Sequence, residues 1–403
     1  MKFRASILGA CLALLGLLVA PLLPPAPAAV TVQAASGSST EPYPGETLCL
    51  PDAYLQTPAN CLPLGPSQTL TDLAKQGISY PPLPLPASKP PFDLTVSPVQ
   101  IAKINLANNL PVGIFSTLDD AVAGTNPVRQ IAPGVTRYVS YIATQRVNGK
   151  PYVELASGEW VRASPSGYPT FQGLQFRQTP TSAFGWMLDN IQPYLAPGFA
   201  QKGTLIPQKQ QEYTVPKWAV IQIEDIQTVD GMEWYKIGED EWVPWQKARR
   251  VRVNTTPPKG VTGDRWIEVN LYDQTVSIYD HRQLIFATLM ASGVEPLYTR
   301  PGLFQIQSKY KVYTIEGAFN ADRSDYYYLQ DVPWTMFFDE GRALHGAYWR
   351  AWFGYPGTHG CVNLSIGDSA WLFQWANVGD WVYVWDPSGQ TPVDPSLYGP
   401  GGA

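Results

Sequence analysis

The residues of this chain best suited to covalent chemistry lie close together near its C-terminal end. Cys361 directly follows Thr358, His359 and Gly360, and another histidine, His345, lies upstream. A thiol becomes a useful nucleophile when an imidazole accepts its proton and backbone N–H groups stabilise the charge that develops on the attacked carbonyl oxygen. Gly360 permits a tight turn or a positive φ that would expose the sulfur. The cluster therefore predicts a cysteine nucleophile, with His345 or His359 as its base.

The alternative is that Cys361 is a small buried apolar residue and that the histidines are structural, which is the usual role of an isolated cysteine or histidine. The other cysteines favour the catalytic interpretation. Cys11 lies in a predicted export signal, and Cys49 and Cys61 are close enough in sequence to close a small disulfide loop. Such a loop is worth roughly 3 kcal/mol in an oxidising compartment. Cys361 is then the unpaired thiol of an exported protein, which is either a liability or a reagent.

The cluster resembles the catalytic domain of the L,D-transpeptidases (YkuD type). The signature of that family is an upstream His-Gly or His-Ser, followed by Ser/Thr-His-Gly-Cys, a hydrophobic residue and Arg or Asn. His345-Gly346 matches the first part, and Thr-His-Gly-Cys-Val-Asn at 358–363 matches the second without a gap. The resemblance extends back to about Asp264 and includes an opening hairpin at 266–271 and 275–279 and a Thr-Pro-x-Gly-x-Phe segment at 299–304. Arg300, inserted in that last segment, departs from the family pattern.

The resemblance implies a reaction on peptidoglycan stem peptides. Cys361 would attack the carbonyl of a diamino residue, release the terminal D-alanine and form a thioester. The side-chain amine of a second stem would then attack the thioester and join two diamino residues directly. His345 would be the general base and acid, held in its tautomer by the backbone carbonyl of Gly346.

The same resemblance gives expectations for the remaining site residues. His359 and Gly360 would shape the turn and help supply oxyanion donors together with the amide of Cys361. The residues expected to support the loop or to contact substrate are Thr358, Asn363, Trp349 and Tyr348. The chain has three histidines without ligand-like spacing, so we expect no metal and no cofactor. His281 is predicted to be a solvated residue of a hairpin turn.

Two other functions stay open at this stage. An L,D-carboxypeptidase or endopeptidase would use the same Cys-His site, with water in place of the amine that resolves the thioester. A noncatalytic wall-binding protein would bind peptidoglycan equally well after alkylation of Cys361. The sequence does not decide between the transpeptidase and the hydrolase.

Composition places the site in a mainly β protein of several domains. The 403 residues include 39 prolines and 34 glycines, and only 15% are charged, which favours turn-rich β structure over long helices. The net charge is −5, and Arg249-Arg250 is the longest basic run, so nucleic acid is a poor candidate for a partner.

The N-terminal region is predicted to direct export and to form a spacer that extends across a cell wall. Residues 1–34 form a predicted signal peptide, with Lys2 and Arg4 before an apolar run, and cleavage is expected after Ala28 or Ala34. An uncleaved signal would instead anchor the chain in a membrane. Residues 35–91 are rich in proline and are predicted to form an extended stalk. These features predict an extracellular protein associated with the cell wall.

Two segments between the stalk and the catalytic domain repeat one pattern. Residues 148–161 recur as 230–243 with Gly, Glu, Trp and Val in register, and each copy begins with a favoured hairpin turn, Asn-Gly or Asp-Gly. Both resemble bacterial SH3-like modules, small β-barrels. Their tryptophans could pack a barrel core or form a ligand-binding face.

The predicted domain order is therefore as follows: an SH3-like module at 92–165, a connecting segment at 166–211 with a short helix near 184–188, a second SH3-like module at 212–256, a catalytic domain at 262–386 and a disordered tail at 387–403. Within the catalytic domain, apolar residues alternate with period two at 267–271, 276–278 and 285–289, which predicts a half-buried sheet. We expect a YkuD-like β-sandwich with short helices, one of them at 369–377 and a closing strand at 382–385. The strand that delivers His345 is predicted from 337–339 and 343–344.

Overall fold

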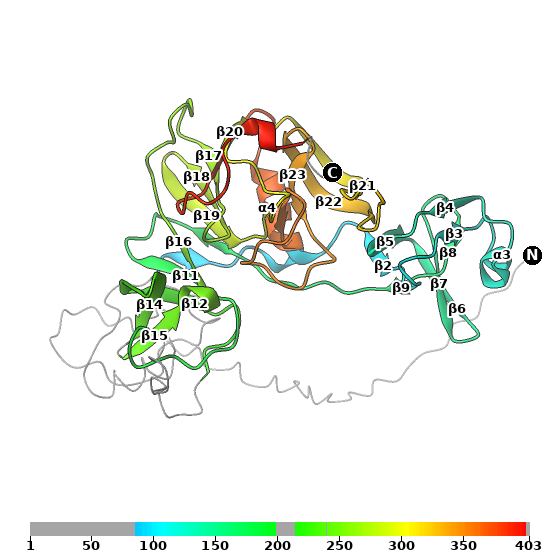
Figure 1. The fold of residues 1–403 in the computed structure, drawn as a ribbon, viewed down its shortest axis with the longest axis horizontal. Coiled ribbons are helices and arrows are strands. Elements are labelled where there is room, and N and C mark those ends of the chain that lie inside the picture. Colours follow the sequence, from blue (N-terminus) through cyan, green and yellow to red (C-terminus); the bar gives the residue numbers. More distant parts are fainter. Residues whose placement is uncertain (1–84, 199–213, 239, 400–403) are drawn as a thin grey trace, which may run out of the picture. The chain divides into compact units, whose positions relative to one another are not determined.

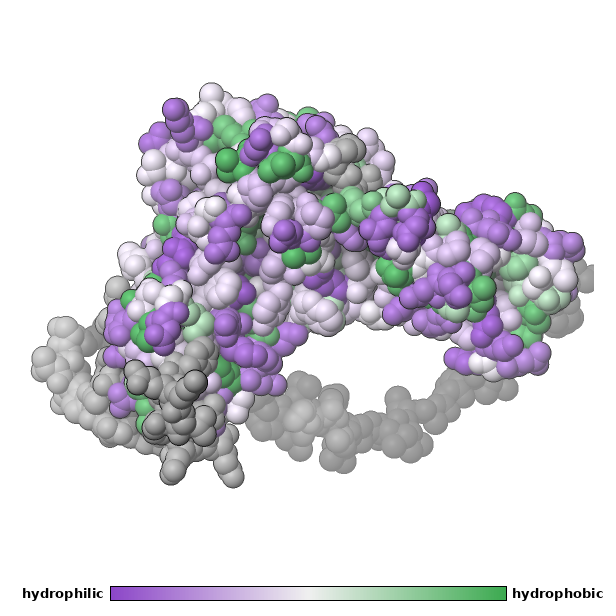
Figure 2. Space-filling model, viewed as in Figure 1, coloured by the Kyte–Doolittle hydropathy of each residue, from purple (hydrophilic) through white to green (hydrophobic). Residues whose placement is uncertain are grey.

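The computed structural model describes residues 85–198, 214–238 and 240–399 (Figure 1). Within these ranges the protein is mainly β structure with few, short helices, as the composition predicts. The predicted signal peptide (1–34), the stalk up to residue 84 and the Cys49–Cys61 pair lie outside the described residues. None of the helices in the described ranges is long and apolar enough to cross a membrane. The face drawn in Figure 2 carries its hydrophobic residues in small groups between hydrophilic ones.

One sheet, which we call the scaffold sheet, contains the predicted opening hairpin. Its order is β1 (Ala87–Ser88), β10 (Leu174–Phe176), β19 (Gln283–Leu289), β18 (Thr275–Asp280), β17 (Trp266–Asn270), β25 (Trp381–Trp385) and β20 (Gly302–Gln305). Strands β17, β18 and β19 form an antiparallel meander, which confirms the three strands predicted from period-two alternation. Strand β25 runs parallel to β17 and corresponds to the predicted closing strand.

The second sheet, which we call the catalytic sheet, carries His345. Its order is β24 (Val362–Leu364), β23 (Arg342–Gly346), β22 (Tyr327–Asp339), β5 (Thr136–Tyr141), β2 (Gln100–Lys103) and β9 (Ser164–Pro165), and β21 (Ser308–Gly317) also pairs with β22. The predicted strand from 337 to 344 is thus a hairpin formed by β22 and β23.

A shared apolar core joins the two sheets. It contains Ile267, Val276 and Phe286 from the scaffold sheet, Met336, Leu344 and Val362 from the catalytic sheet, and Leu372 from helix α4 (Ile366–Trp375). Helix α4 begins three residues before the predicted helix, because the side chain of Ser365 caps it by accepting a hydrogen bond from the amide of Asp368.

Asp368 connects this helix to the scaffold sheet. Its buried carboxylate accepts hydrogen bonds from the hydroxyl of Thr288 (2.6 Å) and from the amide of Gly173 (2.8 Å). Burial raises the pKa of Asp368 to about 6. The contact with Gly173 ties the predicted connecting segment into the catalytic domain.

The catalytic sheet crosses the boundary predicted between the first module and the catalytic domain. Strand β5 pairs in parallel with β22, with Thr136 opposite Tyr327 and Tyr138 opposite Leu329. Gly134 permits this close approach, because a Cβ there would lie 2.3 Å from the carbonyl oxygen of Tyr326. The segment 92–165 is therefore not a separate module: β2, β5 and β9 complete the catalytic sheet.

The remainder of this first segment forms small sheets of its own. They are β3 (Val112–Ile114) with β4 (Arg129–Ile131), and β6 (Ala143–Val147), β7 (Lys150–Glu154) and β8 (Trp160–Val161), with the short helices η2 (Phe92–Thr95) and α3 (Leu118–Ala123). The end of the predicted stalk is also structured, because β1 pairs with β10.

The connecting segment contains a strand where the sequence analysis placed a short helix. Strand β11 (Ala183–Met187) lies between β12 (Val220–Ile223) and β16 (Ala248–Val251). A Cβ at Gly185 would lie 1.8 Å from the carbonyl oxygen of Arg249, so only glycine allows the neighbouring strand this close. The helix prediction was wrong because that pairing is invisible in the local sequence.

The internal repeat is confirmed as a repeated hairpin. Asn148-Gly149 and Asp230-Gly231 all have positive φ (51° to 77°), as the favoured two-residue turn requires. They join β6 to β7 and β13 (Asp225–Val229) to β14 (Met232–Gly238), and β14 continues to β15 (Glu241–Pro244) and η3 (Trp245–Lys247). Trp234 is fully buried, which favours core packing for that side chain. The SH3-like identity of the two copies stays a prediction.

The C-terminal tail is ordered as far as residue 399, contrary to the predicted disorder from 387. It contains η4 (Pro395–Leu397), and Arg342 of β23 donates a hydrogen bond to the carbonyl of Gly399 (3.0 Å). The same guanidinium lies over the ring of Tyr398, 5.3 Å from its centroid. These contacts with a buried arginine provide the ordering that the Pro- and Gly-rich composition did not predict.

Candidate active site

Strands β23 and β24 bring the two predicted catalytic residues together. They pair in parallel with Leu344 opposite Val362 and His345 opposite Asn363, and Cys361 directly precedes β24. His345 and Cys361 line one pocket of about 220 Å³. Its other lining residues are Thr136, Ile315, Tyr327, Leu329, Trp349, Arg350, Gly357, Thr358, His359 and Asn363.

His345 is buried and oriented by its own backbone. Its Nδ1 lies 3.3 Å from the carbonyl oxygen of Gly346, which can only accept a hydrogen bond. Nδ1 therefore carries the proton, and Nε2 is left as the basic nitrogen. Burial lowers the pKa of His345 to about 4, and the nearby charge of Arg350 also lowers it. The ring is neutral at physiological pH, as a general base must be.

Cys361 is likewise buried and uncharged in this state. Its thiol donates to the carbonyl of Gly341, with an Sγ–O distance of 3.7 Å. Burial raises the pKa of Cys361 to about 11. Cys361 is the free cysteine of the described residues. The resting site therefore holds a neutral thiol and a neutral imidazole rather than an ion pair.

The turn before the cysteine is held by hydroxyl groups. Thr358 Oγ1 donates to the carbonyl of Cys361 (2.7 Å) and accepts from the amide of Gly360 (3.2 Å). Thr299 Oγ1 donates to the carbonyl of Gly360 (2.8 Å) and accepts from the amide of Gly293 (2.9 Å). Gly360 has φ +115°, which confirms the positive φ predicted for it. Because its amide is bonded to Thr358, this N–H is already engaged in the resting site.

The other histidine of the motif stands between aromatic rings. The ring of His359 lies 4.6 Å from that of Phe319 and 5.2 Å from that of Tyr327, measured between centroids. Burial lowers the pKa of His359. Its packing fits the predicted role in shaping the turn, while the tautomer-fixing contact with a carbonyl belongs to His345.

The predicted substrate-contacting residues divide into two groups. Thr358, Asn363 and Trp349 line the pocket, and the ring of Trp349 lies 5.6 Å from that of His345. Tyr348 is not among the lining residues. Its hydroxyl donates to the carbonyl of Gln330 (2.7 Å) and its ring packs on Tyr138, so it supports the sheet.

Sequence reasoning missed a second group of pocket residues. Thr136, Ile315, Tyr327 and Leu329 come from β5, β21 and β22, and they meet only because those strands pair. They belong to ordinary strand patterns, so nothing in their local sequence marks them. Arg350, which directly follows Trp349, also lines the pocket, although its sequence neighbourhood gave it no individual role.

Arg300, the inserted residue, forms an ion pair with a buried carboxylate. Arg300 Nε donates to the buried carboxylate of Asp339 (2.9 Å), which also accepts from Arg342 (3.2 Å). Asp339 thus joins the segment after Thr299 to the strand that carries His345. The departure from the family pattern is accommodated by an ion pair beside the site.

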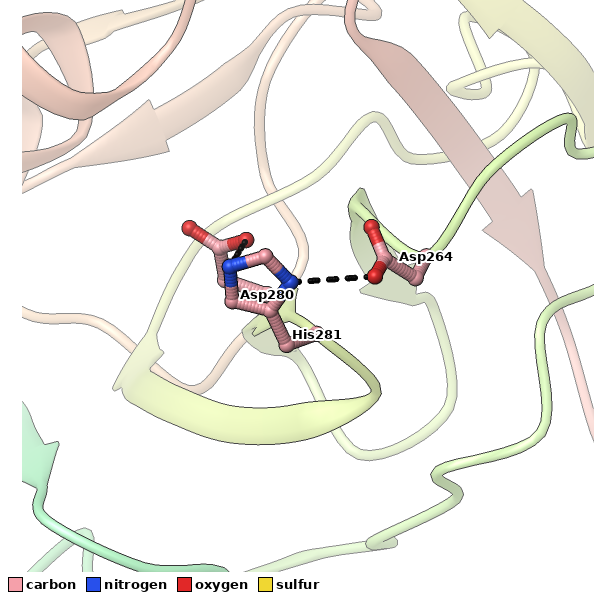
Figure 3. Close-up of side chains that lie close together, drawn as sticks. All are labelled: Asp264, Asp280 and His281. Carbon is pink, nitrogen blue, oxygen red and sulfur yellow. Dashed lines mark hydrogen bonds and ion pairs between the residues drawn. The ribbon is translucent and has the colours of Figure 1, made fainter.

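His281 lies apart from this pocket, in the turn between β18 and β19, as the sequence analysis predicted. Figure 3 shows its ring between Asp264 and Asp280, with Nδ1 3.0 Å from Asp264 and Nε2 3.9 Å from Asp280. The side chain is 84% exposed. Hydrogen bonding to Asp264 raises the pKa of His281. An exposed ion pair of this kind accounts for the three side chains.

Comparisons with known proteins assign part of the chain to a family. Residues 264–384 match the family model of the YkuD L,D-transpeptidase catalytic domain. A search with the chain finds no significant match among curated proteins.

Solved structures similar to the chain include three described as L,D-transpeptidases. A mutant of the Enterococcus faecium enzyme is 26% identical over 30% of this chain and 50% of its own, with a TM-score of 0.28. The catalytic domain of the E. faecium enzyme is 28% identical over 31% of this chain and all of its own, also with a TM-score of 0.28. A Mycobacterium smegmatis enzyme is 16% identical over 53% of this chain and 90% of its own, with a TM-score of 0.29.

The chain thus spans half the length of the first of these proteins. The family model covers the scaffold hairpin and every pocket residue except Thr136. Residues 264–384 of this chain are therefore a YkuD L,D-transpeptidase catalytic domain.

Proposed function

We propose that this protein is a peptidoglycan L,D-transpeptidase that forms direct cross-links between the diamino residues of two stem peptides. The observation that carries the proposal is the pairing of β23 with β24, which brings His345 and Cys361 to one pocket. His345 is oriented by the carbonyl of Gly346, so that a basic nitrogen is available. A buried nucleophile and an oriented base are what thioester chemistry requires.

In the first half of the reaction, Cys361 Sγ attacks the carbonyl carbon of the diamino residue while His345 Nε2 accepts the thiol proton. The two pKa values, about 11 for the thiol and about 4 for the imidazole, favour proton transfer together with attack over a preformed ion pair. The C–N bond to the terminal D-alanine then breaks, and His345 returns the proton to the leaving amine. A thioester on Cys361 and free D-alanine result.

In the second half, the side-chain amine of another stem attacks the thioester carbonyl and loses a proton to His345, and Cys361 leaves as the thiol. The tetrahedral intermediates need hydrogen-bond donors for their oxyanion. We assign that role to the amide of Cys361, with the His359–Gly360 turn holding it in place. Gly360 contributes through its conformation, since its own amide is bonded to Thr358.

The decisive experiment is intact-mass analysis of the purified protein after incubation with a disaccharide-tetrapeptide, with and without a second stem as acceptor. A covalent adduct on Cys361, together with a cross-linked dimer that lacks one D-alanine, is the expected result. Tripeptide and D-alanine without dimer would identify a carboxypeptidase. No adduct and no product, with binding that survives alkylation of Cys361, would identify a wall-binding protein.

The proposed substrate also implies a location. Peptidoglycan lies outside the cytoplasmic membrane, so we propose that the protein is exported and works in contact with the cell wall. The predicted signal peptide at 1–34 supports this location from the sequence.

A further inference from the structure

Arg350 is a cation of the pocket that lacks a carboxylate partner. Its side chain lines the pocket together with His345 and Cys361. Its Nη2 donates to the carbonyl of Gly357, while its Nε is buried without a hydrogen-bond partner. No carboxylate of the described residues forms an ion pair with it.

Arginines beside the pocket have more partners, although Nε of Arg342 is also buried without a hydrogen-bond partner. Arg342 and Arg300 share the carboxylate of Asp339, and Arg137 donates to four backbone carbonyls. Burial lowers the pKa of Arg350, a sign that its charge is poorly solvated. A half-buried guanidinium with one carbonyl partner can bind an anion from outside, which would add hydrogen bonds and neutralise its charge.

The proposed donor peptide carries such an anion at the required place. In a stem that ends in D-alanine, the terminal carboxylate is two bonds beyond the nitrogen of the bond that breaks. Each of these bonds is about 1.5 Å long, so the carboxylate lies within about 5 Å of the carbonyl that Cys361 attacks. A group that recognises it must therefore line the same pocket as Cys361 and His345, and Arg350 does.

We propose that Arg350 forms a carboxylate-binding subsite for the C-terminal carboxylate of the donor stem peptide. This inference rests on the proposed function. A guanidinium can bind a carboxylate through two parallel N–H···O hydrogen bonds, which gives both strength and orientation. The contact holds the leaving D-alanine beside His345, and it selects peptides that end one residue after the cleaved bond over longer peptides.

The test compares two donors on the full chain: a disaccharide-tetrapeptide with a free C-terminal carboxylate and the same compound with a C-terminal amide. The proteins are the wild type, Arg350→Gln, Arg350→Lys and Arg146→Gln. Arg146 is a matched control, because it is exposed and also donates to a glycine carbonyl, that of Gly149 at 2.7 Å. The measured quantity is kcat/KM for formation of the Cys361 thioester, followed by intact mass.

We expect the wild type to prefer the carboxylate donor by about 30- to 100-fold, the range for a charge-assisted pair. Arg350→Gln should lose that preference by slowing on the carboxylate donor alone, with its rate on the amide donor within about twofold of wild type. Arg350→Lys should keep part of the preference, because the charge remains without the planar fork. Arg146→Gln should behave as wild type.

Three results would overturn the inference. If the wild type shows no preference for the carboxylate donor over the amide donor, there is no carboxylate subsite, and this result does not depend on the folding of any variant. An Arg350→Gln protein that slows equally on both donors assigns Arg350 to support of the Gly357 turn. An Arg350→Gln protein that keeps the full preference places carboxylate recognition elsewhere. If the folded wild type forms no thioester with either donor, the proposed function fails and the subsite fails with it.

Discussion

Two groups of residues line the pocket that holds Cys361 and His345, and they are built in different ways. The loop wall comprises His345, Trp349, Arg350 and five residues of the segment 357–363, which are close in sequence. The strand wall comprises Thr136, Ile315, Tyr327 and Leu329, which come from three strands. The loop wall is held by hydrogen bonds from Thr299 and Thr358, whereas the strand wall depends on the pairing of β22 with β5 and β21.

The difference teaches how this pocket divides its work. In the proposed mechanism, the groups that break bonds lie in the loop wall, where hydroxyl groups of Thr358 and Thr299 hold the turn before Cys361. Groups that shape the pocket sit where long-range sheet pairing sets the register. We therefore expect substitutions of Cys361, His345 and Thr358 in the loop wall to reduce kcat and substitutions in the strand wall to change KM.

The strongest test of the loop wall is Cys361→Ala. Without the sulfur no thioester can form, so turnover should fall by at least about 10⁴-fold. The fold should survive, since the hydrogen bond that the thiol donates, to the carbonyl of Gly341, is long and weak and alanine fills most of the same space. Thioester formation by intact mass and the circular dichroism spectrum check the two statements. Turnover at the wild-type rate would remove Cys361 from the mechanism.

The next effect belongs to the base. His345→Gln should reduce kcat by about 10²- to 10⁴-fold, the usual contribution of a general acid–base group, with KM changed little. His359→Gln is the matched control from the same motif, and it should cost less because that ring is held between Phe319 and Tyr327. A larger loss for His359→Gln than for His345→Gln would exchange their roles.

The buried imidazole should also make stability depend on pH. Burial lowers the pKa of His345 from 6.5 to about 4, so the unfolded chain takes up a proton in that interval while the folded protein does not. Stability from this group is complete above pH 6.5 and falls as the pH drops to about 4. The loss is about 3 kcal/mol, roughly 300-fold in the folding equilibrium.

Other buried groups act in the opposite direction over part of this range, since burial raises the pKa of Asp368 to about 6 and that of Glu268 to about 8. The measurement is therefore a difference: urea unfolding of wild type and His345→Gln at pH 7, 5.5 and 4. The free energy of unfolding of the variant should rise relative to that of the wild type as the pH falls. For the control Leu329→Ala, in the strand wall, the free energy of unfolding should change with pH in parallel with that of the wild type. The same parallel change for His345→Gln would contradict the prediction.

A smaller effect is expected from the turn itself. Thr358→Val removes one hydroxyl that serves both Cys361 and Gly360, and the two hydrogen bonds together are worth about 1.5 kcal/mol. The expected loss in kcat is about tenfold. Thr179→Val is a suitable control, because its hydroxyl also accepts from a backbone amide, that of Leu284 (2.9 Å), but lies outside the pocket. Equal losses for both variants would show a general effect on folding.

The smallest effect should come from the strand wall. Thr136→Val keeps the shape of the side chain and removes its hydroxyl from the pocket. We expect KM to rise about two- to fivefold with kcat within about twofold of wild type. A drop in kcat as large as that of Thr358→Val would erase the distinction between the two walls.

Much of the loop wall could be predicted from the sequence, because its residues act through short spacings. The Thr358–Asn363 motif, the positive φ at Gly360 and the hairpins at Asn148-Gly149 and Asp230-Gly231 all follow from local chemistry. The same holds for the β17–β18–β19 meander, whose period-two alternation marks a half-buried sheet.

The sequence alone was thus enough to propose Cys361 as the nucleophile, to place histidines near it and to predict the mainly β character of the chain. Tertiary structure alone decided that β5 pairs with β22, that Gly185 lies in a central strand, and that Thr136 and Arg350 enter the pocket. The two kinds of feature differ in the sequence separation of the residues that specify them. Turns and motifs are specified by residues a few positions apart, whereas the partner of a strand is selected by burial and register across nearly the whole chain.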